Sequence, residues 1–268
     1  MLKIIIHLFI FAFLSVLTQV GGIVYFAALY GSNKFQLGRV KSVGLFVIVY
    51  LLTTFAIVPL IAPVFGRTAL PITGNLRPLN IITCLLNRHY VRPELKKQLT
   101  SVAEQMNRNF DGTRTNYLDA NFPFYEGFPL FPHLNHNDGR KVDLAFYYVD
   151  TRSGEQSNDA PSFIGYGIYE GPTKEEVNYP NRCAEQGFWQ YGLLTYAVPK
   201  WNEDKLKVDA HRTAELIRLL AEDELTAKIF IEPHLKKRWN LSRYDKIRFH
   251  GCQAVRHDDH IHTQIKHQ

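Results

Sequence analysis

The sequence predicts an α+β fold in which two transmembrane helices precede an antiparallel sheet with flanking helices. Three observations carry this prediction: two long segments without charged residues, alternating strand patterns, and amphipathic helical stripes. Of the 268 residues, 46% are hydrophobic and 13% aromatic, so a sizeable core can form. We expect a two-helix membrane anchor over residues 1–66, a linker over 67–92 and a folded domain over 93–268.

The membrane anchor is predicted from residues 4–33 and 42–66, which contain no Lys, Arg, Asp or Glu. Each segment exceeds the roughly 20 residues that a helix needs to cross a bilayer core. A cleaved signal peptide is the alternative for the first segment. Its apolar run is far longer than the roughly 7–15 residues of a signal peptide, and a second apolar segment follows almost at once. We therefore expect two retained transmembrane helices.

The connection between the two segments predicts their orientation. Residues 31–41 carry Lys34, Arg39 and Lys41 and no acidic residue. Because positive residues favour the cytoplasmic side, this connection is expected in the cytoplasm. The N-terminus and everything after Gly66 would then lie on the extracytoplasmic, or periplasmic, side.

Net charge and cysteine content narrow the class of partner. The formal charge of +6 and the pI near 9.1 suit an acidic polymer outside the cell at least as well as nucleic acid. No basic run is interleaved with aromatic residues, so nucleic acid is not an expected partner. Cys183 and Cys252 either form a disulfide in an exported domain or stay buried thiols, and Cys84 lies near the membrane.

The chain after the anchor begins with few periodic features. Residues 67–92 are interrupted by proline and glycine, which predicts a linker. Pro93 starts a helix that runs to about Asn109. Its apolar stripe consists of Leu95, Leu99, Val102 and Met106. A strand over 113–122 and an aromatic, proline-punctuated loop over 122–132 are expected next.

A histidine pair precedes the most clearly alternating strand. His133 and His136 are followed by Gly139, which permits a tight turn, and residues 141–149 are rich in β-branched and aromatic side chains. Alternation places Asp143 on the face opposite its apolar neighbours in this strand. Asp143 can therefore point at the same place as His136, and the two would supply one oxygen and one nitrogen ligand.

The remaining elements are predicted from local pattern. Residues 163–169, 187–198 and 227–233 are expected to form strands, and residues 211–221 an amphipathic helix. Histidines scattered among these elements are interpreted as structural. They are His89, His211, His234, His250 and His267.

The final strand carries the second histidine cluster. If the stretch after His257 is extended, His260 and His262 share one face about 7 Å apart, while Ile261 and Ile265 face the core. One imidazole can bind a metal while its neighbour overhangs the open coordination position. A solvated histidine-rich tail is the alternative, and the cluster around His136 argues against it.

The two clusters together predict a catalytic zinc site. Such a site takes three protein ligands and leaves the fourth position to water, and His136, Asp143 and His262 satisfy that count. His260 is then available as general base or as support for the oxyanion. Asp258 and Asp259 are suited to orient imidazoles. In a regular strand, His257 would face away from His260 and His262. It joins the site only if the chain turns near Asp258.

These motifs carry a resemblance to a known family. His133-x-x-His136-x-x-Gly139-x-x-Val142-Asp143, followed by His257-Asp258-Asp259-His260-x-His262, resembles the metal site of the penicillin-insensitive murein endopeptidases. They belong to a group of zinc peptidases with the lysostaphin-type enzymes, D-alanyl-D-alanine peptidases and the hedgehog domain. The resemblance covers the two motifs and their order. Asn135 stands where the family often has Ser, and the transmembrane helices are not part of the family pattern.

The resemblance implies a function and a role for each site residue. His136, Asp143 and His262 would be the zinc ligands, and His260 and His257 the base or the transition-state stabiliser. The protein would be a membrane-anchored extracytoplasmic zinc metallopeptidase that hydrolyses peptide cross-links of peptidoglycan. The alternative is a non-catalytic zinc-containing module that binds cell-wall peptide or a protein.

Overall fold

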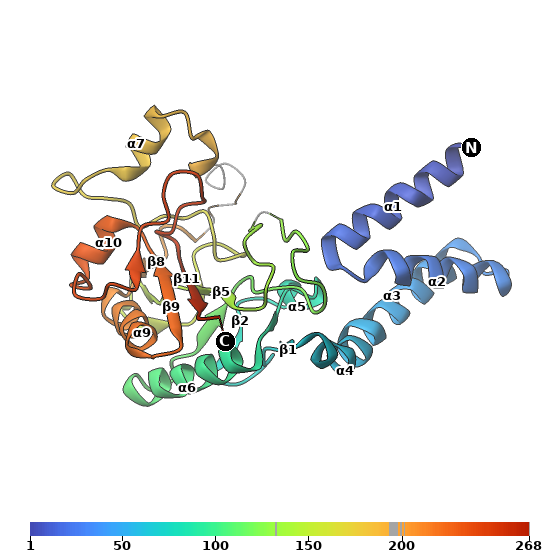
Figure 1. Cartoon of the computed structure of the whole chain (residues 1–268), viewed down its shortest axis with the longest axis horizontal. Coiled ribbons are helices and arrows are strands. Elements are labelled where there is room, and N and C mark those ends of the chain that lie inside the picture. The colour runs from blue at the N-terminus through green and yellow to red at the C-terminus, as the bar shows by residue number, and fades with distance from the viewer. Residues whose placement is uncertain (132, 193–197, 199, 201, 268) are drawn as a thin grey trace. The chain divides into compact units, whose positions relative to one another are not determined.

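The computed structural model describes residues 1–131, 133–192, 198, 200 and 202–267 (Figure 1). The chain divides into two compact units, each built from three segments. The helical unit contains Met1–Leu70, Ile81–Lys96 and Asp119–Gly139. The sheet unit contains Pro71–Asn80, Lys97–Leu118 and Arg140–Gln268.

The helical unit begins with apolar helices. They are α1 (Leu2–Thr18), α2 (Gly21–Lys34) and α3 (Arg39–Leu52), which continues through a π-helical turn (Thr53–Ile57), α4 (Val58–Ile61) and a 3₁₀ turn (Ala62–Phe65). Within the described residues, one helix, Arg39–Phe65, is long and apolar enough to cross a membrane, and its length is 27 residues. α1 is also apolar but has 17 residues.

The prediction of one continuous helix over residues 4–33 is wrong. Gln19 adopts a left-handed conformation with φ of 68° between α1 and α2, so the helix does not continue. After this break the rings of Phe11 and Phe26 stack 4.8 Å apart. A Cβ on Gly22 would lie 2.1 Å from Ser15 Oγ, so glycine is what permits this approach. The absence of charge gave no signal of the break.

The segment expected to be a linker carries short regular elements. They are β1 (Thr68–Ala69), β2 (Leu76–Pro78), α5 (Ile82–Leu85) and β3 (Tyr90–Val91). β1 pairs with β3. The buried Arg67 guanidinium, next to this pair, donates to the carbonyls of Phe122 and Asn137 at 3.1 and 3.3 Å. Arg67 thereby ties the loop that contains His136 to the end of the long apolar helix.

The sheet unit is organised around a mixed sheet. Among the described residues, six strands are ordered β10-β9-β11-β5-β4-β2. Besides β2, they are β4 (Thr115–Tyr117), β5 (Lys141–Ala145), β9 (Thr226–Phe230), β10 (Ile247–Arg248) and β11 (His260–Ile265). The central pairs, β9 with β11, β11 with β5 and β5 with β4, are antiparallel, whereas the outer pairs are parallel. The α+β class is confirmed, with a mixed sheet in place of an antiparallel one.

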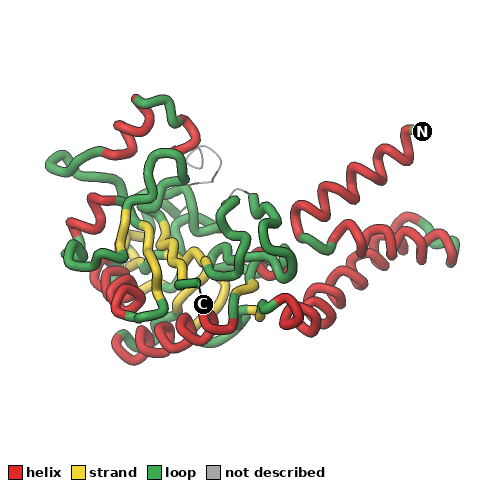
Figure 2. The backbone as a smooth tube through the Cα atoms, in the orientation of Figure 1, coloured by secondary structure: helices red, strands yellow, loops and turns green. Residues whose placement is uncertain are grey.

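Helices accompany this sheet, as predicted. α6 (Pro93–Asn109) has the predicted bounds, and Gln98 on it donates to Thr226 of β9 at 2.8 Å. α9 (Ala210–Glu222) packs beside β9, and the Asp209 side chain caps it by accepting from Arg212 N (Figures 1 and 2). Shorter helices are α7 (Tyr179–Glu185), a 3₁₀ turn (Trp189–Gly192) and α10 (Pro233–Arg238).

The predicted strand over 141–149 is divided between two sheets. After β5, the backbone of Tyr147 bonds to the start of α9, because Tyr147 N donates to Thr213 Oγ1 and Tyr147 O accepts from Asp209 N. The chain then enters a second sheet, where β6 (Tyr148–Asp150) pairs with β7 (Gln156–Ser157) and β8 (Leu206–Val208). These tertiary bonds end β5 two residues after Asp143.

Two other predicted strands differ from the structure. Residues 163–169 form a loop, because Gly165 and Gly167 have φ of 81° and 86°. The predicted strand over 187–198 begins instead with the 3₁₀ turn, and its residues 193–197 lie outside the described residues.

The cysteine alternatives are resolved in favour of a bridge. Cys183 on α7 is disulfide-bonded to Cys252, 69 residues further along the chain, whereas Cys84 is a buried thiol outside the bridge. We expect Cys183→Ser to lower the free energy of unfolding by about 2–5 kcal/mol, because the crosslink restricts the unfolded chain. Urea denaturation of parent and variant, each with and without reductant, measures this. A reductant that shifts the variant's midpoint as far as the parent's would contradict it.

Candidate metal centre

The pairing of β5 with β11 brings together the second cluster of predicted site residues. His262 lies directly opposite Asp143, and His260 opposite Ala145. Opposed residues of antiparallel strands point to the same face, so one carboxylate meets both imidazoles. His262 Nδ1 lies 2.8 Å from Asp143 Oδ1, and His260 Nε2 lies 3.8 Å from Asp143 Oδ2. Asp143 is 1% exposed.

Tyr166 is a member of this cluster that the sequence did not indicate. Its hydroxyl donates to Asp143 Oδ2 at 2.8 Å, and its ring meets the His260 ring edge to face at 4.8 Å. The neighbouring Gly167 N donates to Asp259 Oδ2 at 2.6 Å. The glycine-flanked loop thus holds both Asp143 and the partner of His260. The pattern Gly-Tyr-Gly over 165–167 is the available signal for this loop, and the positive φ of both glycines excludes the predicted strand.

Asp259 has the predicted orienting role toward an imidazole. Its Oδ1 lies 2.5 Å from His260 Nδ1. Burial acts to lower the pKa of His260, but the carboxylates of Asp259 and Asp143 together outweigh it and hold the pKa above its ordinary value. Asp258 instead pairs with the Arg256 guanidinium at 2.5 Å, and the His234 imidazole lies 3.7 Å from it.

His257 joins the cluster because the chain before β11 is not extended. β11 starts at His260, and Glu232 holds His257 by its backbone: Glu232 N donates to His257 O at 3.0 Å, and Glu232 Oε1 accepts from His257 N at 3.3 Å. The His257 ring centroid lies 4.8 Å from that of His260 and 5.8 Å from that of His262. Burial, with the adjacent imidazoles, keeps the pKa of His257 well below its ordinary value, so it is neutral.

His250, interpreted as structural, lies next to His257. The two rings stack 5.4 Å apart, and His250 also meets the ring of Phe230 at 4.3 Å. Burial lowers the pKa of His250. His250 lies on an irregular segment after β10, so no periodic pattern identifies it as a site residue. Of the other histidines interpreted as structural, His89 is buried with a pKa of about 3, His211 packs on Phe110, and His234 lies 3.7 Å from Asp258.

The first histidine cluster belongs to the loop that Arg67 holds. His136 Nδ1 lies 2.7 Å from the carbonyl oxygen of Ala120. A carbonyl only accepts, so Nδ1 carries the proton, and Nε2 is left with the lone pair that a metal ligand needs. His133 Nδ1 lies 3.5 Å from Asp119 Oδ2, and its ring centroid lies 5.4 Å from that of His136. Both imidazoles are buried.

The segment from His133 to Asp143 contains a group that could hold a metal ion. One ligand atom from each of His133, His136 and Asp143 lies within 4.8 Å of the other two, and all three residues are buried. Two of these residues belong to the predicted triplet. The third predicted ligand, His262, bonds to the carboxylate of Asp143, and His133 is an additional candidate. Imidazole nitrogen with carboxylate oxygen is a donor set that suits zinc.

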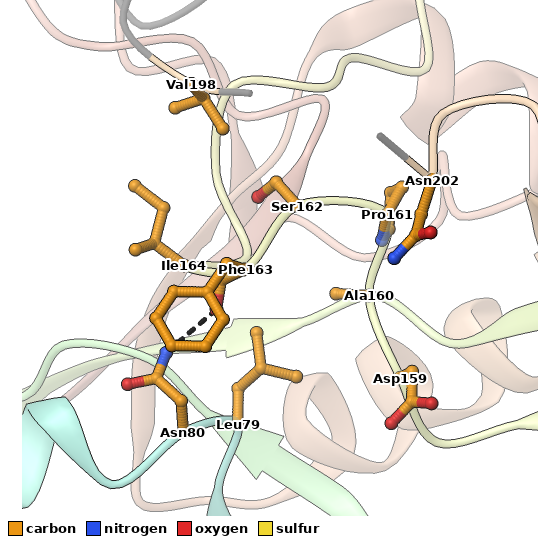
Figure 3. Close-up of a pocket in the computed structure, with 10 residues that line it drawn as sticks. All are labelled: Leu79, Asn80, Asp159, Ala160, Pro161, Ser162, Phe163, Ile164, Val198 and Asn202. Atoms are coloured by element: carbon orange, nitrogen blue, oxygen red, sulfur yellow. Dashed lines mark hydrogen bonds between the residues drawn. The ribbon is translucent and has the colours of Figure 1, made fainter. Parts of the chain in front are cut away.

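A pocket in the sheet unit adjoins the loop that carries Tyr166. Figure 3 shows this cavity of about 540 Å³, whose lining is apolar at Leu79, Ile164 and Val198. The Asn80 amide donates to the carbonyl of Phe163 at 2.9 Å across its edge. Ser162 Oγ in the lining donates to Tyr166 O at 2.7 Å. The pocket wall is therefore continuous with a residue that touches Asp143.

No protein-family model matches the chain, and no curated protein matches it in sequence.

Proposed function

We propose that the protein is a membrane-anchored zinc metallopeptidase that hydrolyses peptide cross-links of peptidoglycan on the extracytoplasmic side. The observation that carries the proposal is the pair formed by Asp143 and His262, with His260 and its partner Asp259 beside it. A structural ion would not need a second buried imidazole oriented by its own carboxylate. A hydrolytic site does need one, because a proton must be taken from water.

The proposed ligands are His136 Nε2, Asp143 and His262 Nδ1. In a tetrahedral zinc site with bonds of about 2.0–2.1 Å, neighbouring ligand atoms lie about 3.3 Å apart. The 2.8 Å between His262 Nδ1 and Asp143 Oδ1 is a hydrogen-bond distance, so these two atoms would have to separate by about 0.5 Å to bind one zinc ion. The bond from His136 to Ala120 O supports the same assignment, because it fixes the tautomer that binds metal through Nε2.

The chemistry divides between the cation and His260. A zinc ion bound there supplies Lewis acidity toward the scissile carbonyl and lowers the pKa of a bound water to roughly 7. His260 Nε2 would accept a proton from the attacking water and later pass it to the leaving amine. Its raised pKa depends partly on Asp143, whose negative charge a bound cation would offset, so the imidazole becomes available as a base near neutral pH. The neutral His257 imidazole is suited to donate to the oxyanion.

Two further observations favour an extracytoplasmic cell-wall substrate. The Cys183–Cys252 disulfide suits an oxidising compartment. The apolar helix Arg39–Phe65 suits a membrane anchor. Peptidoglycan peptides lie in that compartment, and the pocket next to Tyr166 offers apolar wall and amide groups to a peptide. The motif resemblance supplies the substrate class.

The proposal is tested with the full chain in nanodiscs, loaded with zinc and incubated with isolated cell-wall sacculi. Newly released amines are counted and identified by mass spectrometry. Release that stops with His260→Ala, while zinc remains bound, supports the peptidase. Zinc bound without any release, together with retention on sacculi, would instead indicate the non-catalytic binding module.

Removing the Tyr166 hydroxyl tests the support of Asp143. We expect Tyr166→Phe to weaken zinc binding about 10-fold or more, because partners that orient a ligand typically contribute 10–100-fold to affinity. Competition with a chromophoric chelator measures the affinity. Tyr179→Phe, whose ring packs on Phe249 of the same unit, is the matched control. Equal affinities for the two variants would show that the bond to Asp143 is unimportant for the metal.

A further inference from the structure

The first two helices form a hairpin whose two open ends point the same way. α1 and α2 are separated by the break at Gln19 and Val20, and side chains on both sides of it meet. His7 Nδ1 lies 2.6 Å from the hydroxyl of Tyr25, and Gly22 packs against the turn of α1 that contains Phe11 and Ser15. The chain therefore reverses direction near residue 19. The start of α1 and the end of α2 lie at the same end of the helical unit.

The closed end of this hairpin packs on the later part of the helical unit. Gln19 Oε1 accepts from Phe124 N at 3.0 Å, and the Asn87 side chain donates to Thr18 O at 3.3 Å. Val20 belongs to a buried cluster with Val58, Ala62 and Tyr90. Hence the closed end lies beside the last turns of the helix Arg39–Phe65 and the segments that follow it. The open ends lie toward the start of that helix.

All positive groups of the first 66 residues lie toward the open end. This stretch contains no Asp or Glu, and its positive groups are the N-terminal amine, Lys3, Lys34, Arg39 and Lys41. The four side chains are exposed. Between the two ends the outward side chains are apolar, with Phe9, Phe13 and Ile23 at 70%, 56% and 69% exposure. A charge-free apolar surface of this kind between two polar ends suits contact with lipid.

We propose that α1 and α2 enter the membrane as a hairpin, with the N-terminus and the turn before Arg39 together on the cytoplasmic side. There their five positive groups meet the anionic phosphates of the lipid headgroups. The remainder of the chain lies across the membrane. The N-terminus is thus on the side opposite to the one expected from a single helix over residues 4–33. This inference rests on membrane insertion of Arg39–Phe65 and is independent of the peptidase activity.

The test is a two-sided protease assay on the full chain in spheroplasts, with an uncharged epitope at each terminus. We expect the N-terminal epitope to resist external protease until the membrane is lysed, while the C-terminal epitope is lost at once. Digestion of both epitopes in intact spheroplasts would overturn the hairpin, because a single helix over residues 4–33 requires that result. Protection of the C-terminal epitope would overturn the proposed orientation.

Charge variants test the role of the basic end. The triple variant Lys34→Gln, Arg39→Gln, Lys41→Gln is expected to lose part of the N-terminal protection, because fewer positive groups hold this end in the cytoplasm. The matched control removes three exposed lysines outside the anchor, Lys97→Gln, Lys174→Gln and Lys207→Gln, and is expected to retain the parent's protection. Equal protection in both variants would show that these charges do not set the topology.

Discussion

Replacing His260 by alanine is expected to slow peptide hydrolysis about 10²–10⁴-fold, the range for loss of a positioned general base. The reason is geometric. Asp259 bonds to Nδ1 of this imidazole, and Nε2 lies 3.8 Å from the Asp143 carboxylate, so the ring is oriented toward the proposed metal without being one of its ligands. The measurement is kcat for amine release from sacculi, with zinc content determined on the same samples.

The zinc content gives this experiment its discriminating power. Removing a base that does not bind the metal leaves the zinc content unchanged. Removing a ligand lowers the zinc content. His211→Ala is the matched control, because this imidazole packs on Phe110 away from the cluster in the sheet unit. Retention of the parent's kcat in His260→Ala would contradict the proposed base. Loss of zinc in that variant would make His260 a ligand and move the proton-transfer role to His257.

Local periodicity predicted the helices and strands that bury one apolar face. α6 and α9 have apolar stripes that remain apolar wherever the helix packs, so their bounds follow closely from the chain alone. The alternation in β11 predicts which of its side chains share a face. The elements that could not be predicted depend on bonds to distant residues. The backbone of Tyr147 bonds to Thr213 and Asp209 and therefore does not continue β5. No feature of residues 141–149 predicts these bonds.

The same distinction separates the site residues that were found from those that were missed. His260, His262 and Asp143 stand at positions whose parity within a strand is visible in the sequence, and the pairing of β5 with β11 joins them. Tyr166 and His250 lie on irregular segments, and their places depend on glycine conformations and side-chain packing. The break at Gln19 could not be predicted either. A segment without charged residues predicts an apolar environment, but it does not predict where the chain reverses direction.

Substitution of the proposed zinc ligands is expected to have the largest effect on the metal. His136→Ala and His262→Ala should each lower zinc affinity by more than the roughly 10–100-fold that orienting partners contribute. Zinc retained after dialysis against a competing chelator is the measurement, by elemental analysis. Full zinc content in His136→Ala would refute the centre, because both the predicted triplet and the observed His133, His136 and Asp143 group contain this residue.

The role of His133 distinguishes an open, catalytic zinc site from a closed, structural one. If His136, Asp143 and His262 are the only protein ligands, one position stays open for water, and His133→Ala keeps most of the zinc and the hydrolytic activity. If His133 also coordinates, four protein ligands close the shell, as in structural zinc sites. His133→Ala would then weaken zinc binding as much as His262→Ala does, and the parent would release no amines from sacculi. The comparison of these two single variants therefore separates a peptidase from a zinc-containing binding module by metal content, without depending on the choice of substrate.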